Sequence, residues 1–67
     1  MLLIVRTVRV PAHNVETARP IMKEMVDASR SENGCVEYVY AEDLFDAGLI
    51  HIKERWITQD ALKAHAV

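Results

Sequence analysis

The first ten residues are mostly aliphatic or β-branched, with two arginines interspersed. The run from Leu2 to Val10 is closed by Pro11, a pattern that predicts a first strand. Because apolar residues fall on both faces of this strand, we expect helices to cover one side of the sheet and a partner the other. The two apolar sets are Ile4, Val8 and Val10 on one face, and Leu3 and Val5 on the other.

Apolar side chains recur at steps of three and four residues between Asn14 and Ser31, the spacing of one helical face. Pro20 complicates this first helix, because a proline inside a helix removes a hydrogen bond and costs about 3 kcal/mol. We expect Thr17 to cap the helix, so that Pro20 lies in its first turn; a kinked helix from Asn14 is the alternative. Gly34 is expected to end it in a left-handed conformation.

Alternation of apolar and polar residues predicts a second strand from Cys35 to Glu42. An acidic turn then reverses the chain at Gly48 into a third strand, Leu49 to Ile57, so that the two strands form a hairpin. Thr58 is a good N-cap for a second helix. In the third strand, one face is expected to hold Ile50, Ile52, Glu54 and Trp56.

The predicted order is β-α-β-β-α, which indicates an α+β, ferredoxin-like fold with an antiparallel sheet, in a single domain over residues 1–67. A split β-α-β arrangement normally supplies one more strand after the second helix, and here that final strand is missing. With the first and third strands adjacent, an open edge along Leu2 to Val10 would need to be paired or protected.

Length and composition point to self-association. A chain of 67 residues buries only about 60% of the surface that its unfolded form exposes. Cys35 is the only cysteine, and the three histidines are scattered, so neither a disulfide nor a metal site is expected to stabilise the fold. With 51% hydrophobic residues, a homodimer or higher homo-oligomer is expected.

The formal net charge is −2, and the eight basic residues are dispersed, which argues against nucleic acid as a partner. The longest strongly apolar run, Met1 to Val5, is too short for a membrane span or a signal peptide. We therefore expect a soluble, cytoplasmic protein, and the unpaired Cys35 agrees with a reducing compartment.

Two segments of this pattern match a known family. One is Ser31-Glu-Asn-Gly-Cys-Val-Glu-Tyr38, and the other is Glu54-Arg55-Trp56 followed by Ala61-Leu62-Lys63-Ala64-His65. With these segments the chain resembles, over essentially its whole length, the antibiotic biosynthesis monooxygenase domain, a branch of the dimeric α+β barrel proteins. Members usually continue beyond the alanine-histidine pair to a final strand, so the chain is expected to be a fragment or a short member.

The resemblance implies a homodimeric barrel in which two sheets meet face to face, with a pocket in each subunit between sheet and helices. It also implies oxidation of a small phenolic or quinol-type aromatic molecule by molecular oxygen. The aromatic substrate supplies the electrons itself, so no metal, flavin or other cofactor is expected. Other branches degrade haem or transform small phosphorylated sugars.

Trp56 matches the pocket tryptophan of the anthrone-oxidising branch, where the indole could pack on a flat substrate; a core anchor is the alternative. In that branch its polar partners lie four residues before it and six after it. Those positions hold Ile52 and Leu62 here, so we do not expect anthrone-type chemistry by the known arrangement.

His65 lies on the second helix, one turn along from Leu62, and is the candidate catalytic base, because histidine titrates near neutral pH. A surface histidine at the helix end is the alternative. His51, on the opposite strand face from Trp56, is expected at the surface or in a dimer interface.

Glu54 and Tyr38 join Trp56 as candidate substrate-binding residues. Burying Glu54 without a partner would be costly, so Arg6 on the neighbouring strand is its expected mate, and proton transfer is the alternative role. Tyr38 and Tyr40 share one sheet face and could supply a phenol to the pocket or pack in the core or interface. Three functions remain open: a cofactor-independent monooxygenase, a non-enzymatic dimeric ligand-binding or assembly module, and a small-metabolite isomerase.

Overall fold

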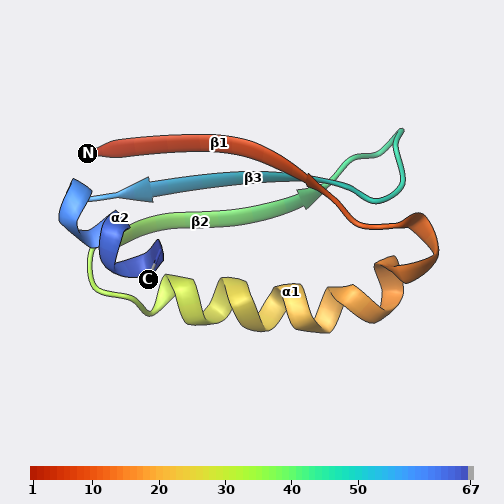
Figure 1. Ribbon diagram of the computed structural model, residues 1–67, viewed down its shortest axis with the longest axis horizontal. Helices are drawn as coiled ribbons and strands as arrows, with labels where there is room; N and C mark the ends of the chain where they lie inside the picture. Colours follow the sequence, from red (N-terminus) through yellow and green to blue (C-terminus); the bar gives the residue numbers. More distant parts are fainter. Residues whose placement is uncertain (67) are drawn as a thin grey trace.

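A computed structural model describes residues 1–66 as an antiparallel three-stranded sheet with two α-helices (Figure 1). The predicted order and the α+β class are confirmed. The elements are β1 (Leu2–Arg9), a 3-10 turn (Ala12–Asn14), α1 (Val15–Arg30), β2 (Cys35–Glu42), β3 (Leu49–Trp56) and α2 (Gln59–Ala66).

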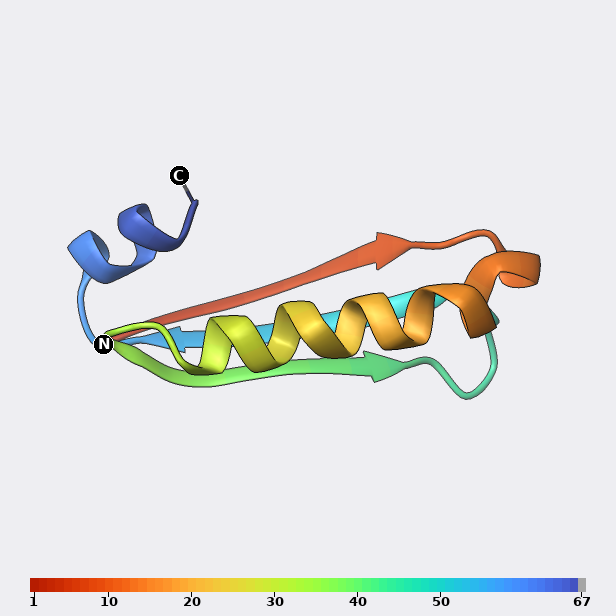
Figure 2. The ribbon, with the colours of Figure 1, turned by 90° about the horizontal axis from the view of Figure 1, so that it is seen from below.

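The sheet has the order β1-β3-β2, so β3 is central and pairs antiparallel with both neighbours. The expected adjacency of the first and third strands is therefore confirmed. Both helices pack against the face that carries Trp56. Figure 2 shows α1 running along the sheet, whereas the shorter α2 covers only the end where β3 finishes. None of the helices in residues 1–66 is long and apolar enough to cross a membrane.

The helix-covered face of β3 forms the core. Burial alternates along the strand, with Ile50, Ile52, Glu54 and Trp56 at 3% exposure or less, as the sequence pattern predicts. Trp56 is completely buried and packs with Val26 of α1 and Tyr38 of β2. Ala61 and Leu62 of α2 pack against this cluster near the end of β3.

The start of α1 differs from the prediction. The helix begins at Val15, with Pro20 inside it, so the expected cap at Thr17 is wrong and the alternative start near Asn14 is closer. No side chain caps the first turn; a 3-10 turn leads into the helix, with the Asn14 N–H donating to the Pro11 carbonyl at 2.8 Å. The earlier start buries Val15 to 6% exposure, which offsets the hydrogen bond that Pro20 removes.

Two left-handed glycines and one helix cap shape the connections between the elements. Gly34 has the expected left-handed φ, 85°, but it does not end the helix: α1 ends at Arg30 with Ser31 as its cap, and Gly34 lies in the turn before β2, where its carbonyl accepts the Ile57 N–H at 2.8 Å. Gly48, with φ of 90°, ends the acidic turn, and its carbonyl accepts the Val10 N–H at 2.8 Å. The Thr58 hydroxyl accepts the Ala61 N–H at 3.1 Å, which confirms the predicted cap of α2.

The opposite face of the sheet is left open by the described chain. Large apolar side chains on this side are half or more exposed, in contrast to the buried residues under the helices. They are Leu3 (54%), Val5 (70%), Val36 (52%) and Ile57 (58%). We call these four residues the helix-free apolar face. On the same side, the central strand β3 carries Lys53 and Arg55, which pair with Glu37 of β2.

Candidate functional site

Glu54 lies at the centre of a polar cluster under the helices. Its side chain is 4% exposed, and both carboxylate oxygens have donors. Oε1 accepts the Trp56 indole N–H at 3.0 Å, and Oε2 accepts the Arg6 Nε–H at 3.3 Å. The strand register produces this contact, because Arg6 lies opposite Ile52, the next residue along the buried face of β3. The expected Arg6–Glu54 pair is thus present.

Four rings pack beside this carboxylate. Tyr38, buried to 3% exposure and opposite Glu54 in the register, stacks on Tyr40 with ring centroids 5.7 Å apart. The Trp56 ring meets the Tyr38 ring edge-on at 6.5 Å. His65 of α2 lies 4.7 Å from the Trp56 ring and 5.4 Å from the Tyr38 ring. The structure therefore brings together all four candidates, Trp56, Tyr38, Glu54 and His65.

Glu32 holds His65 in place, a contact that the sequence reading missed. The His65 Nδ1 and the Glu32 Oε2 lie 2.8 Å apart, and the His65 side chain is 20% exposed. In the tautomer that donates its Nδ1 hydrogen to this carboxylate, Nε2 of the neutral imidazole is left as an acceptor. Glu32 stands two residues before Gly34 in the segment that matches the family, which is the one signal that could have pointed to it.

Trp56 has neither an exposed ring surface nor a free N–H with which to contact a ligand. Its ring is fully buried, and its N–H is already donated to Glu54, so this N–H has no spare hydrogen for a substrate carbonyl or an oxygen species. Ile52 is buried to 1% exposure, and Leu62 packs against the same core cluster. The two aliphatic residues fill the positions beside Trp56.

Burial shifts the acidity of two neighbouring groups. It raises the pKa of Tyr40 to about 12, with Tyr38 adding to the effect, so the Tyr40 phenol is neutral near physiological pH. Burial also raises the pKa of the Cys35 thiol, which is half-buried against the core cluster. A raised pKa keeps this thiol protonated near neutral pH.

His51 stands apart from these groups. It is exposed on the opposite face of β3, as predicted, and its Nε2 lies 2.9 Å from Asp43 Oδ2. Within residues 1–66, no three histidine, cysteine or acidic side chains lie together in a metal-binding arrangement.

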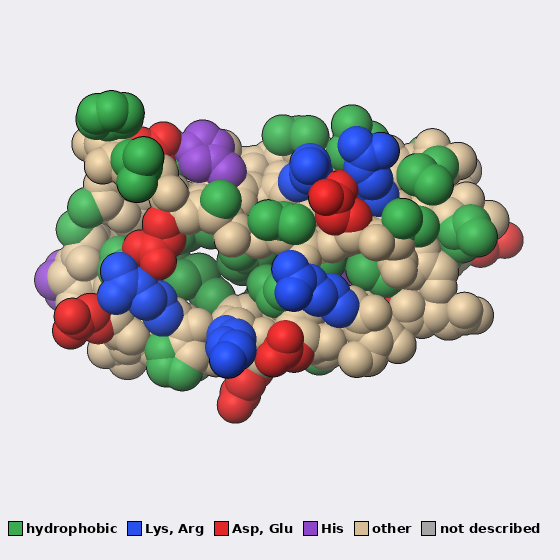
Figure 3. All heavy atoms as spheres, turned by 180° about the vertical axis from the view of Figure 1, so that it is seen from behind, with side chains coloured by type: hydrophobic (Ala, Val, Ile, Leu, Met, Phe, Trp, Pro, Cys, Tyr) green, Lys and Arg blue, Asp and Glu red, His purple; other side chains and the backbone are tan. Residues whose placement is uncertain are grey.

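A hollow lies between α1 and β2 rather than at His65. It has a volume of about 290 Å³, and none of its lining residues is Trp56, Glu54 or His65. Figure 3 shows this hollow in the middle of one face, with basic side chains around it. We place the candidate chemistry at His65 because hydrogen bonds and ring packing converge there, and we treat the hollow as a separate feature.

Comparison with known proteins gives the family context. A family model described as antibiotic biosynthesis monooxygenase matches residues 1–66. No curated protein matches the chain.

Solved structures that share this fold include the following three. A candidate antibiotic biosynthesis monooxygenase from Deinococcus radiodurans is 28% identical with a TM-score of 0.92, over 100% of this chain and 66% of that one. A conserved protein of unknown function from Bacteroides thetaiotaomicron, described as a possible oxidoreductase, is 35% identical with a TM-score of 0.80, over 94% and 66%. A candidate antibiotic biosynthesis monooxygenase from Chloroflexus aurantiacus is 28% identical with a TM-score of 0.77, over 96% and 61%. The chain thus spans less than two thirds of the length of these proteins.

Proposed function

Because the chain belongs to the antibiotic biosynthesis monooxygenase family, we propose that it carries the reaction site of a monooxygenase acting on a small aromatic or quinol-type substrate. The observation that carries this proposal is the Glu32–His65 pair, packed on the Trp56 and Tyr38 rings. A histidine oriented through Nδ1 by a carboxylate presents Nε2 as a general base.

The proposed reaction begins with proton transfer from a substrate hydroxyl to His65 Nε2. Removing this proton makes the aromatic ring easier to oxidise, and Glu32 stabilises the imidazolium that forms. One atom of molecular oxygen then enters the substrate, and the other leaves as water with two hydrogens of the substrate. All four electrons that reduce molecular oxygen come from the substrate, so this scheme uses no metal, flavin or other cofactor.

We place the substrate over the helix-facing side of β1, next to His65. The buried β3 residues leave no room for a ligand, whereas the Arg6 side chain is 46% exposed on the same face. Its guanidinium, held by Glu54, could fix a phenolate or quinone oxygen. In this arrangement Trp56, Tyr38 and Glu54 form the support beneath the substrate and the base.

Oxygen consumption with a panel of quinols tests the proposal. We expect uptake that His65→Ala lowers at least about 100-fold, the usual contribution of a general base. Glu32→Gln should give an intermediate rate, because it keeps the side-chain size but not the charge. His51→Ala, on the opposite face, is the matched control and should retain activity. Uptake that survives His65→Ala would overturn the role of this residue.

A second candidate is a non-enzymatic, ligand-binding or assembly module of the same fold. It is favoured by the filled space at Trp56, where Ile52 is buried and Leu62 packs on the core. Absence of oxygen uptake across the panel, together with saturable binding of the same quinols, would support this function over the first.

We also propose that the protein works as a homodimer through the helix-free apolar face. Leu3, Val5, Val36 and Ile57 expose apolar surface that a second copy would bury. A face-to-face contact of two sheets leaves the helices, and the site beneath them, on the outside of the pair.

A further inference from the structure

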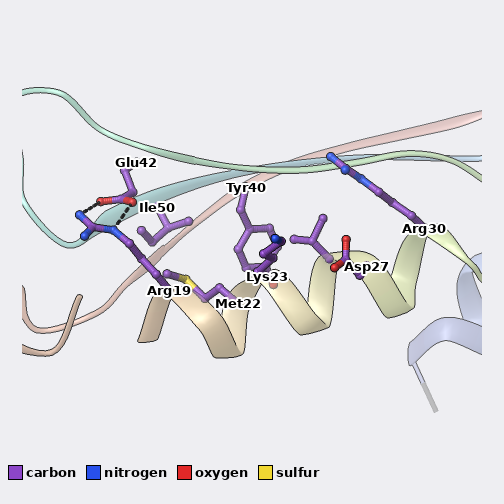
Figure 4. Close-up of a pocket in the computed structure, with 9 residues that line it drawn as sticks. Arg19, Met22, Lys23, Asp27, Arg30, Tyr40, Glu42 and Ile50 are labelled. Atoms are coloured by element: carbon purple, nitrogen blue, oxygen red, sulfur yellow. Dashed lines mark hydrogen bonds and ion pairs between the residues drawn. The ribbon is translucent and has the colours of Figure 1, made fainter. Parts of the chain in front are cut away.

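The hollow between α1 and β2 has an apolar floor. Ile50 and Val26 are buried to 1% and 8% exposure, and Met22 and the Tyr40 ring complete the floor. Figure 4 shows Tyr40 reaching from β2 towards α1, where Lys23 lies beside it. A volume of about 290 Å³ is close to the lower limit of about 300 Å³ for small-molecule pockets, so the space suits a ligand of one ring.

Arg19 and Glu42 close one end of the hollow and neutralise each other. Arg19 Nε and one terminal nitrogen donate to the two Glu42 oxygens at 2.8 and 3.0 Å. Figure 4 shows this bidentate pair at one end and Arg30 at the other. Because both charges of the pair are satisfied, this end adds no net charge for a ligand.

The remaining rim carries a net positive charge. Arg30 donates its Nε–H to the Tyr38 carbonyl at 2.9 Å, and its terminal nitrogens have no partner among residues 1–66. Lys23 likewise has no ion pair or side-chain hydrogen bond in this part of the chain, and Asp27 lies on the same rim. Two cations and one carboxylate leave one positive charge. Tyr40 adds no negative charge, since its pKa is raised to about 12 by burial.

We propose that this hollow binds a small organic monoanion, an aromatic carboxylate of about the size of benzoate. Its ring would lie on Ile50, Val26 and Tyr40, and its carboxylate would take the free donors of Lys23 and Arg30. A ligand of this kind matches both the apolar floor and the single net charge of the rim. The site is separate from His65 and goes beyond the proposed monooxygenase function.

Titration of the full chain with benzoate, followed by amide NMR shifts, tests this site. We expect saturable shifts confined to residues 19–30 of α1, residues 40–42 of β2 and Ile50 of β3. Benzamide, which has the same shape without the charge, should bind at least about threefold more weakly, as expected for an exposed charge contact. Lys23→Gln should weaken benzoate binding by a similar factor, and Lys23→Arg should restore it.

Lys63→Gln is the matched control, since Lys63 is an exposed lysine on α2 outside the hollow. Both glutamine variants replace exposed side chains and should fold alike. Equal binding of benzoate and benzamide, equal loss in the two variants, or shifts centred on the Trp56 indole N–H and α2 would overturn the proposal. The proposal would also be overturned if millimolar benzoate produced no shifts in the hollow because a partner copy or further chain fills it.

Discussion

Glu54 is a carboxylate buried beneath the helices, with a donor on each oxygen. Arg6, whose side chain is 46% exposed, supplies the charge that balances it. We expect Arg6→Met to destabilise the fold by about 2 kcal/mol. Removing one partner of a fully buried ion pair costs about 3–5 kcal/mol, and the cost is lower here because water can reach part of the site. Urea unfolding at neutral pH measures this change.

A double-mutant cycle separates this charge effect from packing. Glu54→Gln keeps an oxygen that can accept the Trp56 N–H at 3.0 Å, removes the charge and replaces the oxygen that faces Arg6 with an NH2 group. In that background, Arg6→Met should cost less than about 0.5 kcal/mol, since no buried charge is left unpaired. Equal costs in the two backgrounds would show that Arg6 acts through packing alone.

The sequence predicts the Glu54 contact and misses the Glu32 contact for a physical reason. Arg6 and Glu54 lie on adjacent strands, where side-chain alternation and register decide which groups share a face. Glu32 follows α1 and meets His65 only because α2 folds back over the end of the sheet. That fold-back depends on tertiary packing, which no local pattern encodes.

At the scale of elements, Gly34 controls how close α2 comes to the sheet. A Cβ on Gly34 would lie 2.5 Å from the Ala61 Cβ and 3.0 Å from Ile57 Cγ2, and its φ of 85° suits only glycine. We expect Gly34→Ala to cost at least about 1 kcal/mol, from the backbone strain plus the displacement of α2. Thermal unfolding measures the cost.

The Ala61→Gly variant separates the cost of displacing α2 from the cost of backbone strain at Gly34. It removes the atom that the new Cβ would strike, and alone it costs about 1 kcal/mol through lower helix propensity. If the clash matters, the double variant will be more stable than the sum of the single changes predicts. If the costs of the two single changes add strictly, the cost of Gly34→Ala comes from backbone strain alone.

The limits of the helices were harder to predict than those of the strands. Strict alternation places β2 and β3 within one residue of their observed ends. At the start of α1, two local preferences compete: Thr17 favours a cap that puts Pro20 in the first turn, while burial of Val15 favours an earlier start. Burial prevails, since Val15 is 6% exposed in the folded chain.

The Arg19–Glu42 pair joins α1 to β2 and should make stability depend on acid pH. The Arg19 guanidinium lowers the pKa of Glu42 below its usual value, so this carboxylate stabilises the fold above roughly pH 4.3, its ordinary pKa, and loses that effect as pH falls through the lowered value. Arg19→Gln should therefore lower the urea midpoint at pH 7, with the difference from the parent shrinking towards pH 3.

Lys23→Gln on the same helix is the control, because Lys23 has no acidic partner within residues 1–66. Its effect on the midpoint should not change over the same pH range. High salt should reduce the effect of Arg19→Gln at pH 7, since exposed pairs are screened. A difference that stays constant from pH 7 to pH 3 would contradict the assigned role of the pair.

At the scale of the whole molecule, the sheet has one covered and one open face. Composition alone predicts self-association, because so short a chain cannot hide its apolar fraction. The structure adds where that surface lies: Leu3 and Val5 of β1 point away from the helices, and both are more than half exposed. The open face of the sheet and its edge strands, β1 and β2, are surfaces that a second copy could use, and a face contact and an edge contact predict different responses to mutation.

A dimer through the helix-free apolar face should be broken by a new charge on β1. We expect the parent to sediment at twice the monomer mass and Val5→Lys, at a site 70% exposed, to sediment as a monomer, since a buried lysine without a partner is costly. Ile21→Lys, on α1 and 57% exposed, is the matched control and should stay dimeric. Pairing along the edge of β1 uses backbone groups that Val5→Lys leaves intact. A dimer that survives Val5→Lys would therefore assign the contact to the strand edge, and a monomeric parent would contradict both arrangements.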